Sequence, residues 1–508
     1  MNVSLAGCRI LTIAACCLSP AYGQYSGSVP PPEQFTGGFK SITEANSEAL
    51  LKVLAGDEFA GRGTGQEGFL KAAKWFAGKL EKSGFQPGGP DGSWFQTIPF
   101  VRTDIVAADS GLSVGDSEVV EGSRLGVSDF FGTVDLSLPV SFVRITGKPP
   151  EISDGQFKDR ILVIQSVSRI RTGNKFLAKA KASAVLVVSR ESRVRSQSVF
   201  QQSTPPGTNP AVQIGAAAAN SLAAACGLSD SFFTEDSPKE NLIVSSSRVA
   251  HCKLNVSRES VDVPNVVGWY PGSDESLRHE HVCIGAHLDH LGVQKGDVYP
   301  GADDNGSGSA SILQIANAIN TNPVKPKRSV LLIAFCAEER GLLGSKHYAA
   351  NPVYPIKDMV CMLNIDMIGR NEESDTESAS DNINTIHLVG SKRISMELHD
   401  LTMDANKSVN FVFEYDQEGV YTRSDHASFA KQGVPITFLF GGFTPRYHKP
   451  TDTLEGINYA KIANCARLNY LTLMMAAEHG HFEKNKVEDT KEKQSTPDNA
   501  APKKADSK

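Results

Sequence analysis

The sequence lacks the features by which several protein classes are recognised. Its nine cysteines include no Cys-x-x-Cys pair, so a cysteine-based zinc site is not expected. The formal net charge of −6 comes without a basic stripe, so nothing indicates nucleic acid as a partner. After residue 23 no run of about 18 apolar residues occurs, and we therefore expect no transmembrane segment in the mature chain.

The two ends of the chain are expected to lie outside the folded part. Residues 1–23 contain one arginine, an apolar run and a small-x-small ending, which predicts a signal peptide and an exported protein, periplasmic or extracellular. The stretch Ile-Ala-Ala-Cys16 resembles a lipobox, so a lipid anchor and a membrane-anchored lipoprotein are the alternative. Residues 483–508 are rich in lysine and acidic residues, which predicts a disordered tail.

Six cysteines follow the predicted signal peptide. Cys283, Cys336 and Cys361 lie in apolar, strand-like runs, where a buried free thiol is expected. A bridge between Cys226 and Cys252 is compatible with an oxidising compartment, but the sequence leaves their pairing open.

The chain is long enough for two or three folded units, with 508 residues of which 40% are apolar. Residues 24–104 begin with a linker-like stretch over 24–36, continue with helical patterns, and are predicted to start the main domain. Short alternating runs over 105–252 predict a separate β-rich unit. Over 253–482 strands and helices alternate, which predicts an α/β fold, a mainly parallel, mixed sheet with helices on both faces. Such sheets collect functional loops at the carboxyl ends of their strands.

Two short motifs match known signatures by letter only. Residues 63–68 fit a dinucleotide-binding fingerprint, but a helical pattern precedes them, so we predict a tight turn that enters a helix. Ser113 fits a nucleophile elbow, but the residues after it are strand-like where a helix should begin.

Possible metal ligands occur in five phrases, each after an apolar run. The phrases are Gly-Ala-His287-Leu-Asp289-His, Gly-Ala-Asp303-Asp304-Asn-Gly-Ser-Gly, Phe-Cys-Ala-Glu338-Glu339-Arg-Gly, Asn-Ile-Asp366-Met and Tyr447-His448-Lys-Pro-Thr-Asp. Imidazoles and carboxylates placed beyond strands are what a two-metal hydrolytic centre needs. We therefore predict a zinc peptidase.

Neighbouring residues in these phrases suggest a division of roles. On a strand, His287 and Asp289 point to the same side, so the Asp289 carboxylate is expected to accept a hydrogen bond from the ring. One of Asp303 and Asp304 is expected to bridge the two cations, and their spacing alone does not say which.

The adjacent pair Glu338 and Glu339 poses the same choice between a metal ligand and a residue facing the bound water. Two zinc ions, three ligating carboxylates and a bridging hydroxide balance in charge, which leaves one glutamate free as general base.

The ordered phrases resemble the di-zinc exopeptidase family of secreted bacterial aminopeptidases and glutamate carboxypeptidase, to which glutaminyl cyclases are related. The resemblance covers roughly residues 50–100 and 266–478. It implies a zinc-dependent aminopeptidase that hydrolyses peptide substrates through a metal-bridging hydroxide. The two zinc ions would be held by His287, Asp304 as the bridge, Glu339, Asp366 and His448.

The same resemblance implies the remaining roles. Glu338 looks like the general base, Asp289 like the partner of His287, and Asp303 like a structural residue. Tyr447 looks like an oxyanion donor, with a packed tyrosine as the alternative. Residues 423–426 match a family phrase in the site floor, and the unit at 105–252 looks like a protease-associated domain.

Alternative functions are a carboxypeptidase or glutaminyl cyclase on the same scaffold, or a non-catalytic binding protein. The acidic loop 370–382 suggests a rim that favours cationic N-termini, or only a solvated loop. The sequence does not indicate an oligomeric state.

Overall fold

A computed structural model describes residues 23–127, 133–166, 175–189, 198–202, 211–234, 240–294 and 296–485. The chain divides into a first unit, Met1–Ile98 with Val263–Lys508, and a second unit, Pro99–Asp262. The predicted signal peptide, apart from Gly23, and residues 486–508 of the predicted tail lie outside the described residues. Within the described ranges, no helix has both the length and the apolar character that crossing a membrane requires.

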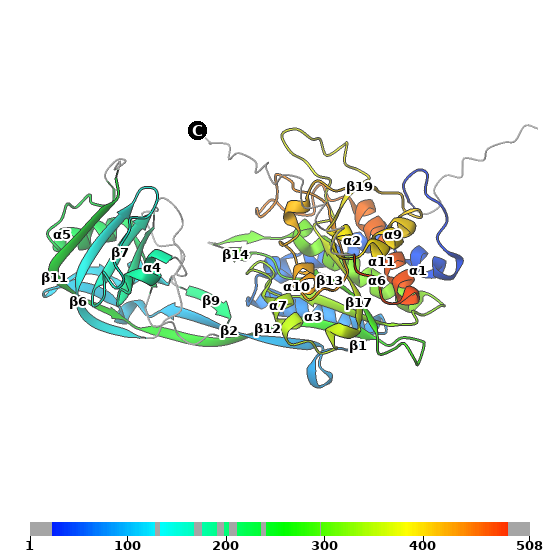
Figure 1. The fold of residues 1–508 in the computed structure, drawn as a ribbon, viewed down its shortest axis with the longest axis horizontal. Helices are drawn as coiled ribbons and strands as arrows, with labels where there is room; N and C mark the ends of the chain where they lie inside the picture. Colours follow the sequence, from blue (N-terminus) through cyan, green and yellow to red (C-terminus); the bar gives the residue numbers. More distant parts are fainter. Residues whose placement is uncertain are drawn as a thin grey trace, which may run out of the picture. The chain divides into compact units, whose positions relative to one another are not determined.

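The first unit is built on a mixed sheet with the strand order β19-β18-β20-β17-β13-β16-β12-β2, in which β1 also pairs with β12 (Figure 1). Its four central strands run parallel: β16 (Ser329–Phe335), β13 (His281–His287), β17 (Met359–Asp366) and β20 (Ile436–Phe440). The others are β1 (Gln86–Pro87), β2 (Phe95–Ile105), β12 (Val256–Tyr270), β18 (Thr385–Val389) and β19 (Val412–Glu414), with a separate hairpin of β14 (Gly292–Gln294) and β15 (Asp297–Tyr299).

The central strands are apolar along their length because helices cover both faces. The helices of this unit are α1 (Thr36–Ser41), α2 (Glu44–Leu54), α3 (Glu67–Lys82), α6 (Gly308–Thr321), α7 (Leu343–Ala350), α8 (Ser391–Ile394), α9 (Met396–Asn406), α10 (His426–Ala430) and α11 (Tyr459–His479). Helices α6 and α11 pack together against β13 and β17. On the other face, Tyr348 of α7 and Phe429 of α10 pack with Cys283, Leu331 and Ile333. The predicted α/β fold is confirmed.

The strand register aligns the ends that carry the predicted ligands. His287 pairs with Phe335, the last residue of β16, and Gly285 pairs with Asn364 of β17. Asp366, the last residue of β17, pairs with Phe440, the last residue of β20. The four carboxyl ends therefore meet at one edge of the sheet.

The linker predicted over residues 24–36 is instead part of the first unit. The backbone N–H of Tyr25 donates to the carbonyl of Val409 at 3.1 Å, and that of Val29 donates to Lys407 at 2.9 Å. Phe35 is 2% exposed. The prediction was wrong because backbone pairing and one buried aromatic ring outweigh a composition rich in Gly, Pro and Ser.

The second unit has its own sheet, ordered β4-β3-β11-β6-β7-β8-β10-β5. Its elements are β3 (Gly111–Val114), β4 (Ser117–Glu121), β5 (Leu125–Val127), β6 (Val134–Ile145), β7 (Ile161–Ser166), α4 (Lys175–Ala180), β8 (Ala184–Ser189), β10 (Ala211–Gly215), α5 (Ala216–Ala225) and β11 (Leu242–Leu254), while β9 (Ser198–Gln202) pairs with the end of β2. Its two apolar cores include Phe142 and Phe157. The unit is slightly wider than the predicted range 105–252.

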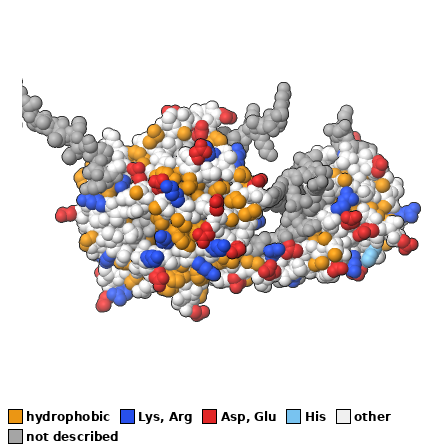
Figure 2. Space-filling view, turned by 180° about the vertical axis from the view of Figure 1, so that it is seen from behind, with side chains coloured by type: hydrophobic (Ala, Val, Ile, Leu, Met, Phe, Trp, Pro, Cys, Tyr) orange, Lys and Arg blue, Asp and Glu red, His pale blue; other side chains and the backbone are white. Residues whose placement is uncertain are grey.

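The six cysteines that follow the predicted signal peptide are free thiols. Cys226 and Cys252 are both buried and unbridged, which settles the pairing that the sequence left open. Cys283, Cys336 and Cys361 are buried and free as predicted. On the face shown in Figure 2, positive and negative side chains are interspersed over the described surface.

Candidate metal centre

The end of β13 supplies the first imidazole of the centre. His287 is 1% exposed, and its Nδ1 lies 3.0 Å from the backbone carbonyl oxygen of Asp289. This hydrogen bond leaves Nε2 of His287 available to bind a cation. The Asp289 carboxylate was expected to accept this bond, and that expectation was wrong because the backbone carbonyl is nearer. The Ser309 hydroxyl donates to the carbonyl of His287 at 2.8 Å and fixes the strand end.

Asp304 lies in the segment Ala302–Ser307, between β15 and α6. The neighbouring Asn305 ties this segment to β17, because its Nδ2 donates to the carbonyl of Ile365 at 2.9 Å and its Oδ1 accepts from the N–H of Met367 at 3.2 Å. The Asp304–Asn305 peptide bond is cis. A Cβ at Gly308 would lie 2.7 Å from the Ile365 carbonyl oxygen, so the close approach to β17 requires glycine there.

Asp452, the last residue of the fifth phrase, holds the same segment from the other side. Its carboxylate accepts from the N–H groups of Asp303 and Asp304 at 3.0 and 3.1 Å, and from the Arg370 guanidinium at 3.1 Å. The Asp303 carboxylate accepts from the N–H of Gly369 at 2.6 Å. Asp303 thus supports the loop, together with Asp452 and Arg370, for which the sequence analysis gave no role.

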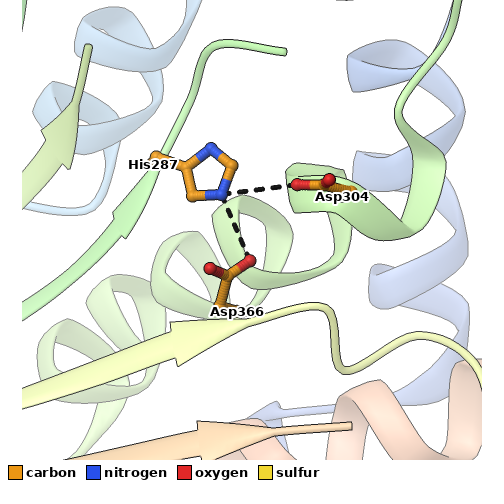
Figure 3. Close-up of side chains that lie close together, drawn as sticks. All are labelled: His287, Asp304 and Asp366. Atoms are coloured by element: carbon orange, nitrogen blue, oxygen red, sulfur yellow. Dashed lines mark hydrogen bonds and ion pairs between the residues drawn. The ribbon is translucent and has the colours of Figure 1, made fainter. Parts of the chain in front are cut away.

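Two groups of potential ligands share Asp304. In the first, His287 Nε2 lies 3.4 Å from Asp304 Oδ1 and 3.1 Å from Asp366 Oδ1 (Figure 3). In the second, His448 Nε2 lies 3.1 Å from Asp304 Oδ2 and 3.2 Å from Glu339 Oε2. A tetrahedral ion with bonds of about 2.1 Å separates its ligands by roughly 3.4 Å. The five residues proposed as ligands therefore come together with the spacing of metal ligands.

Glu338 and Glu339 follow β16 at a turn where Ala337 has a φ of 53°. Glu339 joins the second group, whereas Glu338 lines a pocket beside the first. The Asp289 carboxylate accepts from the N–H of Glu338 at 3.1 Å and from the Thr64 hydroxyl at 2.6 Å. Asp289 therefore positions Glu338 through its backbone.

The turn before α3 contacts the loops that carry the candidate ligands. Arg62 is fully buried, and its guanidinium donates to the backbone carbonyls of Leu288 at 2.8 Å and Gly301 at 2.7 Å. Its own carbonyl accepts from the N–H of His290 at 3.1 Å. The first residues that matched a dinucleotide fingerprint form the predicted tight turn before α3, and Arg62, which precedes them, holds the loops that carry His287 and Asp304.

His290 is a third imidazole at the centre, which the sequence analysis missed. Its side chain is 0% exposed, and Nδ1 lies 2.9 Å from Glu339 Oε1 and 3.7 Å from Asp304 Oδ2. Gly301, with a φ of 59°, makes room for the ring, since a Cβ there would lie 2.5 Å from it. The available signal was a histidine placed directly after Asp289 in the first phrase.

The electrostatics of the centre favour bound positive charge. Burial opposes a charge on His448, but its hydrogen bonds to Asp304 and Glu339 raise the pKa of the ring to about 10. Burial would raise the pKa of Glu339, yet hydrogen bonds from His290 and His448 hold it below its ordinary value. Burial raises the pKa of Glu338 well above its ordinary value. Divalent cations would compete with protons for these groups.

Comparison with known proteins finds a similar family. The pattern of peptidase family M28 matches residues 265–473, a range that contains all five phrases. Residues 265–473 are thus similar to peptidase family M28. A probable leucine aminopeptidase of Trichophyton verrucosum (strain HKI 0517) is 32% identical over 216 residues, which cover 40% of this chain and 55% of the relative. The chain thus spans about half the length of the curated relatives it matches.

Two solved structures share the fold of this chain. An aminopeptidase from Aneurinibacillus sp. strain AM-1 has a TM-score of 0.56 at 22% identity and covers 89% of this chain and 98% of its own. BSAP, a zinc aminopeptidase from Bacillus subtilis, has a TM-score of 0.55 at 19% identity. The match covers 86% of this chain and 95% of BSAP. The family resemblance stated from the five phrases is confirmed. The assignment of the β-rich unit to protease-associated domains stays a prediction.

A pocket lies beside the candidate metal ligands and has both polar and apolar lining residues. Its apolar lining consists of Met367, Val420, Phe438, Phe440 and Phe443. Tyr447 stacks on His448 with 3.8 Å between ring centroids, and its hydroxyl accepts from Arg423 at 3.2 Å. Burial raises the pKa of Tyr447, so its hydroxyl keeps its proton at neutral pH. The ring is therefore both packed and placed at the pocket.

Only some acidic residues of the loop 370–382 are exposed, as the predicted acidic rim requires. Glu372 is 7% exposed, and its Oε2 lies 2.7 Å from Nε2 of the buried His387. This part of the hypothesis was wrong, because Glu372 pairs with an imidazole inside the fold. The exposed acidic residues of the loop are Glu373, Asp375, Glu377 and Asp381.

Proposed function

We propose that this protein is a zinc-dependent aminopeptidase that releases apolar N-terminal residues from peptides. The observation that carries the proposal is the pair of candidate ligand groups sharing Asp304, next to the buried Glu338 and a pocket with one apolar side. Similarity to the M28 family supports peptide hydrolysis, and the zinc aminopeptidase of similar fold supports zinc as the metal.

Two zinc ions fit the residues of this centre. His287 and Asp366 would hold one ion, His448 and Glu339 the other, and Asp304 would bridge them. When bound, such ions polarise a substrate carbonyl and acidify a water molecule. Each ion would then have a bridging carboxylate, a second carboxylate and an imidazole, a ligand set that zinc accepts.

His290 would hold Glu339 in place for the second ion. Its Nδ1 donates to Glu339 Oε1 at 2.9 Å and leaves Oε2, the atom near His448, for the metal. Hydrogen bonds of this kind orient ligating carboxylates and tune the affinity of metal sites.

Glu338 would transfer the proton. It lines the pocket, belongs to neither ligand group, and has a pKa raised by burial toward the working range of a general base. It would take a proton from the attacking water and deliver it to the nitrogen of the leaving amine, as the peptide C–N bond breaks. Asp289 keeps it in position through the backbone contact at 3.1 Å.

The pocket would select the N-terminal side chain. Phe438, Phe440 and Met367 offer apolar surface on the side of the pocket away from the candidate ligands' carboxylates, and Arg423 is the cationic residue in the lining. Burying a leucine side chain in such a pocket contributes about 1.5–3 kcal/mol, which a lysine ammonium would forfeit. The Tyr447 hydroxyl, which accepts a hydrogen bond from Arg423, would donate to the developing oxyanion.

A substrate panel tests the proposal. The zinc-loaded protein should hydrolyse Leu-Ala-Ala, whereas N-acetyl-Leu-Ala-Ala should resist, because an aminopeptidase requires the free amine. Cleavage of the blocked peptide from its C-terminus would instead indicate a carboxypeptidase, and cyclisation of a Gln-Ala-Ala peptide would indicate a cyclase. Failure to bind zinc or to change any peptide would favour a binding protein. Lys-Ala-Ala tests the remaining acidic-rim hypothesis, which requires it to exceed Leu-Ala-Ala.

Export belongs to the same proposal. The signal-like residues 1–23 and the free-peptide substrates are consistent with a periplasmic or extracellular enzyme, with a lipid anchor at Cys16 as the alternative. The mass of the N-terminal peptide of the mature protein distinguishes the two.

A further inference from the structure

A second group of metal-binding side chains lies behind the pocket wall. His387 of β18 stands between Glu372 of the loop 370–382 and Glu414 at the end of β19. Its Nε2 lies 2.7 Å from Glu372 Oε2 and 3.7 Å from Glu414 Oε2, and the three donor atoms lie within 4.8 Å of one another. Asp416 Oδ1 lies 3.1 Å from the other ring nitrogen.

Hydrogen bonds and close packing fix the Glu372 side chain in this group. Glu372 Oε1 accepts from the N–H of Phe443 and from Gln417, both at 3.3 Å, which aims Oε2 at His387. Gly442, with a φ of 90°, leaves the space that Glu372 fills, since a Cβ there would lie 2.4 Å from its Cδ. The His387 side chain is 1% exposed, and its Nδ1 forms no hydrogen bond despite its contact with Asp416.

The negative charge of this group is only partly balanced by the surrounding side chains. In the described part of the chain, no lysine or arginine forms an ion pair with Glu372, Glu414 or Asp416. The buried ammonium of Lys461, which donates to the carbonyl of Asn382 at 3.2 Å, is a nearby positive charge that offsets part of this excess. Burial raises the pKa of Glu414, and the nearby acids add to the rise. Three carboxylates around one buried imidazole therefore leave room for added positive charge.

We propose that Glu372, His387 and Glu414 form a third divalent-cation site, separate from the catalytic pair, with Asp416 at the other ring nitrogen of His387. Carboxylate oxygens with one imidazole nitrogen suit Zn²⁺ or Mn²⁺. The cation would secure the loop 370–382 and β19 to β18. The site does not depend on the proposed peptidase activity, because none of its residues belongs to the ligand groups around Asp304.

The position of the site gives it a function. Its Glu372 accepts from the backbone of Phe443, and the His387 ring lies 5.8 Å from the ring of Phe440. Both phenylalanines line the apolar pocket. A cation at this position would rigidify that wall, so its loss should raise KM for leucyl peptides more than it lowers kcat.

Metal counting tests the proposal. The full-length wild type, Glu414→Gln and Glu373→Gln are dialysed against both Zn²⁺ and Mn²⁺, and total bound ions per chain are measured by elemental analysis. Glu373 is the matched control, since it is an exposed acid of the same loop outside the group. The wild type and Glu373→Gln should hold one ion more than Glu414→Gln. Equal metal content in all three proteins overturns the proposal.

Two further measurements keep the outcome decisive. The Asp416 side chain is 71% exposed, so Asp416→Asn provides a variant with little risk to folding, and it should weaken binding of the extra ion about tenfold. If a folded Asp416→Asn protein binds the extra ion as tightly as the wild type, the site consists of Glu372, His387 and Glu414 alone. If Glu414→Gln also binds the extra ion unchanged, the proposed site is refuted. Hydrolysis of Leu-Ala-Ala is measured separately, so failure of the peptidase proposal remains distinguishable.

Discussion

Replacing Thr64 by valine tests whether Asp289 positions Glu338. Valine keeps the volume of threonine but removes the hydroxyl that donates to Asp289 Oδ2 at 2.6 Å. Asp289 is 0% exposed, and its carboxylate would retain the N–H of Glu338 at 3.1 Å as its hydrogen-bond donor. A buried hydrogen bond to a charged group contributes about 1.5–3 kcal/mol. If losing this hydrogen bond raises the activation free energy by the same amount, because Glu338 is misplaced, kcat falls roughly tenfold to a hundredfold.

The assay compares kcat for Leu-Ala-Ala, zinc content and the unfolding midpoint. Thr103→Val is a suitable control, because Thr103 is also 0% exposed but its hydroxyl has no hydrogen-bond partner among the described residues. We expect Thr64→Val to keep its zinc, lose turnover and unfold earlier, and Thr103→Val to match the wild type. A Thr64→Val protein that is less stable but fully active would refute the positioning role of Asp289.

Four further predictions follow from the same geometry. Glu338→Gln should retain both metals but lose turnover by about a hundredfold to ten-thousandfold, and full activity would end its assignment as the base. Asp304→Ala should lose metal as well as activity, as measured by elemental analysis. His290→Ala should weaken zinc binding about tenfold to a hundredfold in chelator competition, and His290→Asn should restore part of it, whereas a direct ligand would show no rescue. Burial lowers the pKa of His281 from 6.5 to about 4, so its contribution to stability is present above pH 6.5 and is lost as the pH falls toward 4. This loss amounts to roughly 3 kcal/mol, and urea unfolding of His281→Leu at pH 7 and pH 4.5 should show the smaller pH dependence.

The fold and the ligand groups could be predicted because their signals are local. Each ligand follows an apolar run, and parallel strands bring such ends to one edge of the sheet. His287, Asp366 and His448 could therefore be placed together although they are far apart in the sequence.

The supporting contacts could not be predicted, since they depend on three-dimensional packing. Thr64 and Arg62 reach the centre from the turn before α3, and nothing in their phrase specifies Asp289 or the carbonyl of Leu288 as a partner. Glu372 has the composition of a solvated loop residue, yet it is buried against His387 because β18 places that ring beneath it. His290 has the residue type of a ligand, but only the fold shows that Glu339 is its neighbour.

The second unit is inserted into the first unit at a single place in its sheet. The chain leaves the first unit at Ile98 and re-enters it at Val263, and nearby the N–H of Val267 donates to the carbonyl of Trp94 at 2.8 Å. Departure and return thus occur side by side on one sheet, where a short turn would be enough to close the gap. Removing Pro99–Asp262 would therefore leave every candidate metal ligand in the chain, because all of them follow Val263.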